Sequence, residues 1–450
     1  MGSESRGQWP EPAADGLLTE LYELTMASSY LQLGMHDTAV FSLFVRKLPP
    51  RRRMLVVCGI DAAIRRLESF RYDLDSIDYL GATGRFRPED LRAFAEVRFT
   101  GDVWAGKEGE LVFENEPILE VHAPIIEAQL VETIVLNAIH YATAVASKAA
   151  RCVAAAEGRA VVEFGLRRAP EPEGGVTAAR AAYLAGFDST SNVLAGCVYG
   201  IPISGTVAHS FIEAFETERA AFRAVLRTAD GPSTLLVDTY DTMHGVSNAI
   251  VVMRELRANG HLVRAGAPID GFGVGTRLVM ASDAPVLDMA YKIVEYAGQP
   301  RLKMSGGKAT TAFAKQVWRR ARDGQYAEDI LCRRDEPAPD PACHPLLEHV
   351  VEHGRRRRPE IPLNELRAGH AREVARFGRY RSLRGDGTYP VRFSSRLMET
   401  ERQAVADVGY REWQSMARAA PRPRARVSWQ GRYEPWFGKS FVIERTPVET

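Results

Sequence analysis

Hydrophobic residues recur at helical spacing near the start of the chain and again in a long stretch before residue 160. The first run lies between Leu17 and Leu33, and the second extends from about Pro124 to Ala156. Apolar residues three or four positions apart cover one face of a helix, so each run predicts an amphipathic helix. A third helix is expected over Gly59–Phe70. Short apolar runs typical of strands lie between these helices, at Val40–Val45, at Met54–Cys58 and within Val103–Val121.

From Ala160 onward the pattern becomes a regular alternation of short strand-like runs and helical segments. Such alternation is typical of parallel β/α organisation. Polar groups gather at the ends of many successive runs, which favours an irregular or incomplete α/β barrel over an open sheet. Strands are expected at Val161–Gly165, Val193–Cys197, Ile203–Gly205, Leu235–Asp238, Gly271–Gly275 and Arg301–Met304. Helices are expected at Ala178–Ala185, Ser210–Thr228, Val246–Asn259, Val286–Ala297 and Thr310–Arg322.

The chain divides into four predicted parts, because 450 residues exceed one ordinary hydrophobic core. Residues 1–15 are expected to be disordered. Residues 16–155 form an N-terminal α+β domain, and residues 156–330 form the irregular α/β barrel domain that holds the active site. Residues 331–450 are rich in Pro, Arg and Glu, and are expected to pack back on the N-terminal domain with a partly flexible tail.

Composition narrows the class of protein. Hydrophobic residues make up 45% of the chain and the formal net charge is only +1, so no global field favours nucleic acid or a membrane surface. The five cysteines form no CxxC pair, which favours reduced thiols in a cytoplasmic protein and predicts no metal centre built by the protein alone. No signal peptide is visible at the N-terminus. The partners expected are small molecules.

His209 is the leading candidate for catalysis. It follows the apolar run Ile203–Gly205 and precedes a predicted helix, which places an imidazole at the C-terminal end of a strand. A neutral imidazole there can act as nucleophile, base or ligand near pH 7. The alternative is that a histidine at such a junction has only a structural role.

Several other predicted strand ends carry groups suited to phosphate. Arg167 and Arg168 can make forked contacts with phosphate oxygens, although two arginines in a turn can also be merely solvated. Small residues end another strand and expose backbone amides that can cradle a phosphate. The alternative for each glycine pair is a plain turn. The first such segment contains Gly273, Gly275 and Thr276. The second contains Gly306 together with the ammonium groups of Lys303 and Lys308.

Two carboxylates end the predicted strand Leu235–Asp238. Asp238 and Asp241 flank Thr239 and Tyr240, and such groups suit Mg²⁺ or ribose hydroxyls. A helix-capping role for Asp241 is the alternative. Taken together, the strand ends describe a pocket for a highly phosphorylated ligand beside one histidine.

These segments are similar, in order along the chain, to motifs of the nicotinate phosphoribosyltransferases. The resemblance covers about residues 17 to 400. It is carried by Leu18–Met26, Phe44–Pro49, Glu163–Arg168, Gly186–Gly196, Gly205–Phe211, Asp238–Thr242, Phe272–Thr276 and Lys308. The resemblance implies a type II phosphoribosyltransferase fold, usually a homodimer. It also implies transfer of phosphoribose to nicotinate, giving nicotinate mononucleotide, with ATP as co-substrate and Mg²⁺ as cofactor.

The resemblance also assigns roles to individual residues. His209 would carry a phosphoryl group taken from ATP, and a phosphohistidine is a labile intermediate suited to this coupling. Tyr22 and Thr206 would contact the pyridine acid. Arg168 and Arg167 would hold pyrophosphate oxygens, and Thr276 with its glycines would hold the ribose phosphate.

The chain departs from the family pattern after Asp241. There the family has a strand ending in an Arg-Leu-Asp-Ser-Gly-Asp-like motif, whereas this chain runs through Arg264 directly into the Gly273 segment. At about 30 residues for each βα unit, the space holds about one unit where the family has roughly three. The missing groups would face the acceptor. Two alternatives therefore stay open: a phosphoribosyltransferase acting on another aromatic acid or amide, and a catalytically impaired homologue that binds phosphates or a partner.

Overall fold

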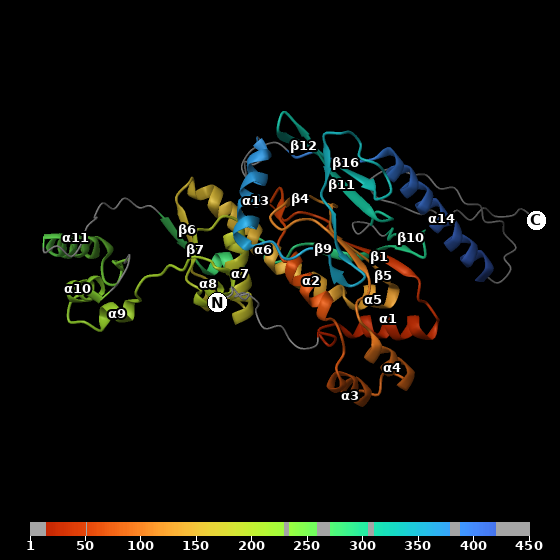
Figure 1. Cartoon of the computed structure of the whole chain (residues 1–450), viewed down its shortest axis with the longest axis horizontal. Helices are drawn as coiled ribbons and strands as arrows, with labels where there is room; N and C mark the ends of the chain where they lie inside the picture. The colour runs from red at the N-terminus through yellow and green to blue at the C-terminus, as the bar shows by residue number, and fades with distance from the viewer. Residues whose placement is uncertain are drawn as a thin grey trace, which may run out of the picture. The chain divides into compact units, whose positions relative to one another are not determined.

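The computed structural model describes residues 15–50, 52–228, 234–258, 271–304, 310–378 and 388–419. The chain forms two compact units (Figure 1). The first, called here the parallel unit, contains the described part of Arg151–Met280. The second, the antiparallel unit, contains the described parts of Trp9–Ala150 and Ala281–Thr450.

A seven-stranded antiparallel sheet forms the centre of the antiparallel unit. Strand β1 (Thr38–Val45) is buried along nearly its whole length, as its run of apolar residues requires. It pairs on one side with β5 (Pro117–Pro124) and on the other with β9 (Met289–Tyr296). The sheet order is β10-β9-β1-β5-β3-β14-β15, with β3 at Asp102–Ala105, β10 at Gln299–Pro300, β14 at Glu348–Glu352 and β15 at Arg355–Arg356.

Helices pack against this sheet and complete the core. The long apolar run gives α5 (Ile125–Leu130) and α6 (Glu132–Ala156), as the sequence pattern predicted. The stretch Ile125–Ala156 is long and apolar enough to cross a membrane, but 67% of its apolar window is buried inside the protein, as in a core helix. The other helices are α1 (Leu21–Gln32), α2 (Ile60–Ser69), α3 (Leu74–Ala82) and α4 (Pro88–Glu96), and a short ribbon pairs β2 (Leu55–Val56) with β4 (Leu111–Val112).

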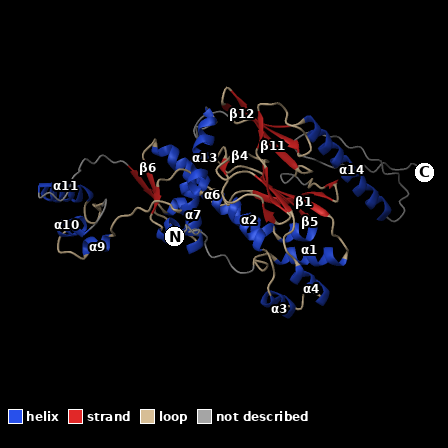
Figure 2. Cartoon of the chain, in the orientation of Figure 1, coloured by secondary structure: helices blue, strands red, loops and turns tan. Residues whose placement is uncertain are grey.

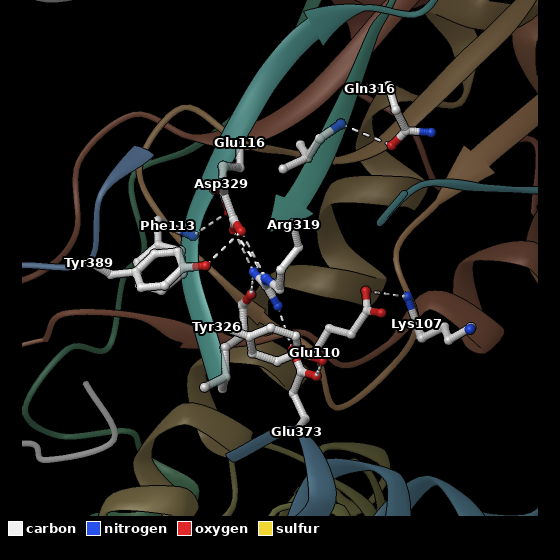
Figure 3. A network of polar contacts seen from close by, with 12 residues as sticks. Lys107, Glu110, Phe113, Glu116, Gln316, Arg319, Tyr326, Asp329, Glu373 and Tyr389 are labelled. Atoms are coloured by element: carbon white, nitrogen blue, oxygen red, sulfur yellow. Dashed lines mark hydrogen bonds and ion pairs between the residues drawn. The ribbon is translucent and has the colours of Figure 1, made fainter. Parts of the chain in front are cut away.

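A second, four-stranded sheet in the same unit contributes two residues, Arg319 and Asp329, to a buried ionic cluster. Arg319 is fully buried and donates to Asp329 at 2.6 Å and to the carbonyl of Leu111 at 2.7 Å, and it also pairs with Glu373 (Figure 3). The hydroxyl of Tyr389 donates to Asp329 at 2.9 Å. The sheet order is β13-β11-β12-β16, with β11 at Lys315–Arg322, β12 at Gln325–Arg333, β13 at Cys343–Pro345 and β16 at Val391–Phe393. Helix α13 (Leu363–Arg376) precedes β16 in the chain, and α14 (Ser395–Ala419) follows it.

The parallel unit contains a three-stranded parallel sheet and a separate cluster of helices (Figure 2). In the sheet, β6 (Ala160–Glu163) lies between β7 (Ser189–Thr190) and β8 (Gly271–Val274). Among the residues that the structure describes, these strands do not close into a barrel, which confirms the irregular, incomplete α/β class. Helices α7 (Pro172–Leu184), α8 (Val193–Tyr199) and α12 (Thr276–Val279) pack beside the sheet and the turn after β6. The helical cluster consists of α9 (His209–Glu213), α10 (Glu218–Thr228) and α11 (Thr242–Ala258).

One predicted strand is a helix. The run Val193–Cys197 lies in α8, because the side chain of Asn192 accepts a hydrogen bond from the backbone N–H of Ala195 at 3.0 Å and caps the helix start. The apolar pattern alone did not separate a short buried strand from a short helix.

Two predicted helices are strands. The segment Val286–Ala297 contains β9, because its backbone pairs with β1 across the large sheet. The segment Thr310–Arg322 contains β11, which pairs with β12 as a hairpin. The segments Leu235–Asp238 and Arg301–Met304, predicted as strands, have no strand assignment in the described residues. Tertiary pairing overrides local preference at β9 and β11.

The two compact units have other bounds than the predicted domains. Residues 281–304 and 310–330, expected in the barrel domain, belong to the antiparallel unit because β9 joins its large sheet. The segment after residue 331 also contributes a strand there, since β14 pairs with β3. Residues 1–14 and 420–450, expected to be disordered or flexible, lie outside the described residues.

Candidate functional site

The strand ends of the parallel sheet bring several predicted site residues to one edge. Strands β7, β6 and β8 run in the same direction, with Glu163 opposite both Thr190 and Val274. Ile203 adds an isolated parallel bridge to Thr190 on the outer side of β7. The loops that follow these strands therefore start from the same edge of the sheet, where α/β proteins hold their ligands.

The two arginines lie in a tight turn directly after β6. A single 3-10 turn, Leu166–Arg168, begins when the backbone N–H of Arg168 donates to the carbonyl of Gly165 at 2.8 Å. The side chains of Arg167 and Arg168 are exposed, and neither forms an ion pair with a carboxylate among the described residues. Two unpaired guanidinium groups in a short turn are suited to bind an anion with several oxygens.

The end of β8 and the residues after it, Gly273–Thr276, are called here the glycine loop. This loop packs directly against the arginine turn. The backbone N–H of Phe164 donates to the carbonyl of Val274 at 2.8 Å. A Cβ atom on Gly273 would come within 2.8 Å of the Phe164 ring, and one on Gly275 within 3.0 Å of the Phe164 carbonyl oxygen. Both glycines are thus required for close packing. This packing places the exposed Thr276, the first residue of α12, next to the arginine turn.

His209 lies in the helical cluster of the same unit, at the start of α9. Its ring is exposed, and Nδ1 lies 3.2 Å from the hydroxyl oxygen of Thr239. Thr206, three residues earlier, is exposed and donates to the carbonyl of Val207 at 3.0 Å. Among the residues that the structure describes, no hydrogen bond joins His209 to Arg167 or Arg168, so the histidine and the arginines form two separate groups of candidate residues.

The two candidate carboxylates differ in their surroundings. Asp241 accepts the backbone N–H of His244 at 2.8 Å and caps α11, which is the structural role considered for it. Asp238 is exposed. The segment before it packs against α11, because a Cβ on Gly245 would come within 2.0 Å of the Val237 carbonyl oxygen. Both carboxylates are exposed, and they differ in that Asp241 accepts the capping hydrogen bond of α11.

Tyr22 and Lys303 belong to the antiparallel unit. Tyr22 lies in the first turn of α1 and is partly exposed, whereas the neighbouring Glu23 is buried and accepts the hydroxyls of Thr19 and Thr133. Burial and the nearby carboxylates raise the pKa of Tyr22, so this phenol keeps its proton. The backbone N–H of Lys303 donates to the hydroxyl of Thr310 at 3.0 Å. Gly306, Lys308 and the Arg264 junction lie outside the described residues.

Sequence reasoning missed two residues that contact the candidate groups. Thr239 is the neighbour of the His209 ring, and its only signal was a hydroxyl between two conspicuous aspartates. Glu163 is fully buried and accepts the backbone N–H of Gly165 at the start of the arginine turn. A carboxylate that ends an apolar strand was visible in the sequence, but its burial was not.

Comparison with known proteins adds an independent set of observations. A family model described as the nicotinate phosphoribosyltransferase (NAPRTase) N-terminal domain matches residues 17–140. A nicotinate phosphoribosyltransferase of Mycobacterium tuberculosis is 44% identical over 431 residues, which cover 85% of this chain and 92% of the relative. One from Bacillus subtilis is 36% identical and covers 72% of this chain and 77% of the relative. The crystal structure of human nicotinic acid phosphoribosyltransferase is 26% identical, with a TM-score of 0.70 over 86% of this chain and 99% of that chain.

The alignment with the mycobacterial relative contains positions that this chain lacks. It extends over 431 positions, which is more than 85% of 450 residues, so part of it faces gaps in this chain.

Proposed function

Because the chain belongs to the nicotinate phosphoribosyltransferase family, we propose that it joins nicotinate to phosphoribosyl pyrophosphate, forming nicotinate mononucleotide and pyrophosphate. The resemblance found in the sequence motifs is confirmed by these relatives. The structural observation that supports the proposal most directly is the packing of the arginine turn against the glycine loop, through Phe164 and Val274. Cationic side chains beside a glycine-rich loop suit the phosphate oxygens of a sugar pyrophosphate donor.

We assign the energy-coupling step to His209. An imidazole nitrogen attacks the γ-phosphorus of ATP, the bond to the bridging oxygen breaks, and ADP leaves. Water later attacks the phosphorus, phosphate departs and the imidazole is restored. The exposed ring of His209 supports this role because it leaves room for a nucleotide, and Thr239 restricts its rotation through the contact at Nδ1.

The other candidate residues then have the following roles in the proposal. Arg167 and Arg168 hold pyrophosphate oxygens, and Gly273, Gly275 and Thr276 hold the ribose phosphate. Glycosyl transfer passes through a state with positive charge on the ribose, so fixed charges contribute more than a strong base. Tyr22 and Thr206 contact the pyridine acid, while Lys303, Gly306 and Lys308 provide further phosphate contacts.

Mg²⁺ is the cation that this chemistry implies. Among the described residues no group of three or more His, Cys, Asp or Glu side chains could hold a metal ion. The exposed carboxylate of Asp238 nevertheless fits Mg²⁺, which usually keeps several waters and binds through one or two carboxylates plus substrate phosphates. When bound, the ion would neutralise charge on the pyrophosphate.

A direct assay tests the proposed function. The purified full chain is incubated with nicotinate, phosphoribosyl pyrophosphate, ATP and Mg²⁺, and nicotinate mononucleotide is measured by chromatography. We expect product from the wild type, phosphorylation of His209 by ATP labelled in the γ-phosphate, and no label on His209→Ala. His244→Ala is the matched control, because His244 lies in the same helical cluster and is expected to leave labelling unchanged.

The two alternatives are separated by the same assay. Pyrophosphate release with another aromatic acid or amide, but not with nicotinate, would support a changed acceptor, which the shortened segment favours. Absence of both product and phosphohistidine from a folded protein would reject the enzyme and support the impaired homologue.

We also propose that the protein is a cytoplasmic homodimer, following the family resemblance. Light scattering coupled to size exclusion measures the mass directly: twice 49.8 kDa is expected, and a mass of 49.8 kDa contradicts it.

A further inference from the structure

Glu163 is a buried carboxylate at the end of β6 that has no role in the proposed reaction. Its side chain is 0% exposed. The backbone N–H of Gly165 donates to Oε1, and the hydroxyl of Thr190 donates to Oε2 at 2.6 Å. Burial raises the pKa of this carboxyl, while the two hydrogen bonds oppose that rise. A buried carboxyl at a strand end would be costly without partners, and both partners lie at the edge where the ligand is expected.

The hydrogen bonds of Glu163 extend to the neighbouring strand and helix. The Thr190 hydroxyl oxygen accepts the backbone N–H of Asn192 at 3.0 Å, and Asn192 in turn caps α8. The backbone N–H of Ser191 donates to the carbonyl of Glu163 at 2.8 Å. Glu163 therefore connects the loop after β6 to the loop after β7 through both its side chain and its backbone.

The same carboxylate fixes the start of the arginine turn. Gly165 donates its N–H to Glu163, and its carbonyl accepts the N–H of Arg168 at 2.8 Å. Gly165 is also packed tightly, because a Cβ there would lie 2.1 Å from a methyl group of Val279 in α12. The peptide that leads into the turn is thus restrained on both sides, whereas the side chain of Arg168 at its end is exposed.

We propose that Glu163 is a positioning residue that holds the Arg167–Arg168 turn in the conformation that binds the pyrophosphate group of the sugar donor. The inference rests on the proposed function, because it takes the donor to be a sugar pyrophosphate. A turn that is already ordered loses less conformational entropy when the anion binds, so the restraint strengthens donor binding. Loss of the restraint is then expressed in the KM of the donor much more than in the KM of nicotinate.

The test compares Glu163→Ala, Glu163→Gln and the control Asp188→Ala. Asp188 accepts the N–H of Val161 at 2.8 Å at the opposite end of β6, so its loss perturbs the same strand away from the arginines. A small displacement of binding groups can cost up to about a hundredfold, and we expect Glu163→Ala to raise the donor KM about tenfold or more. Glu163→Gln keeps an oxygen that can accept from Gly165 and an amide that can donate to Thr190. Its donor KM is therefore expected to stay close to that of the wild type. Asp188→Ala leaves the ratio of donor KM to nicotinate KM unchanged.

A second variant and a binding measurement keep the inference independent of folding and of turnover. Thr190→Val removes one hydroxyl with little change of shape, and is expected to raise the donor KM in the same direction. Calorimetric titration of the full chain with inorganic pyrophosphate and Mg²⁺ requires no catalysis. Weaker pyrophosphate binding by Glu163→Ala in a chain that makes no product supports the positioning role and rejects the proposed function.

The opposite results overturn the inference. If the wild type makes product and Glu163→Ala and Thr190→Val each raise the donor KM and the nicotinate KM by the same factor, Glu163 is merely structural. If the wild-type chain does not bind pyrophosphate at all, there is no anion to position and the inference is wrong.

Discussion

Replacing Arg319 by methionine removes a guanidinium from the centre of the buried ionic cluster of the antiparallel unit (Figure 3). Arg319 and Asp329 are both 0% exposed, and their closest contact is 2.6 Å. Arg319 also donates to the Leu111 carbonyl and pairs with Glu373. Methionine fills much of the volume but leaves the carboxylate of Asp329 without its counter-charge. Removing one partner of a buried pair costs about 3–5 kcal/mol, which is the expected loss in free energy of unfolding.

The neighbouring residue provides a matched control. Arg320 has a side chain 20% exposed and pairs with Glu328 on the other face of β11. An ion pair near the surface is worth roughly 0–1 kcal/mol, so Arg320→Met is expected to cost about 1 kcal/mol or less. The two substitutions are chemically identical and one residue apart, and differ mainly in burial.

Urea unfolding followed by tryptophan emission measures both variants. No tryptophan lies within residues 151–280 of the sequence, whereas Trp104 in β3 and Trp318 in β11 lie in the antiparallel unit and report on its unfolding. The double variant Arg319→Met with Asp329→Asn removes the unpaired charge at Asp329, the more deeply buried of the two carboxylates that Arg319 pairs with, and is expected to recover about 2 kcal/mol of the loss. Equal losses for Arg319→Met and Arg320→Met, or no recovery in the double variant, would refute the reasoning from burial.

Three further predictions concern single positions. Burial lowers the pKa of His370, whose ring hydrogen-bonds to the Gly109 carbonyl. The neutral imidazole therefore stabilises the folded chain fully above the unfolded pKa of 6.5, and this contribution to the free energy of unfolding falls as the pH decreases. Wild type should lose up to about 1.4 kcal/mol per pH unit below that value in urea unfolding, and His370→Asn should lose less. The methyl group that Gly165→Ala adds would clash with Val279, so this variant should lose about 1–3 kcal/mol in free energy of unfolding, measured by thermal unfolding followed by circular dichroism. Partial recovery when Val279→Ala is added checks the contact. Asp241→Ala removes the cap of α11 and should cost about 1 kcal/mol by the same method; no change in melting temperature would contradict the cap.

The sequence by itself determined the family, the irregular α/β class and the local elements with strong periodicity. The helix from Pro124 to Ala156 and the strand at Val40–Val45 follow from patterns of spacing that are complete within one segment. The arginine turn and the glycine loop were also found from sequence, because parallel strands bring their C-terminal ends to one edge whatever lies between them.

Only the tertiary structure decided which short segments are strands and which polar residues are buried. The sequence pattern predicted β9 and β11 as helices. The pairing partner of β9 is β1, about 250 residues earlier in the chain, and β11 pairs with β12 in a hairpin that the spacing of apolar residues does not indicate. Glu163 and Arg319 are charged residues that composition assigns to the surface, yet both are fully buried. The physical reason is the same in each case: pairing and burial depend on atoms distant in sequence, and their free energy outweighs the local preference of the segment.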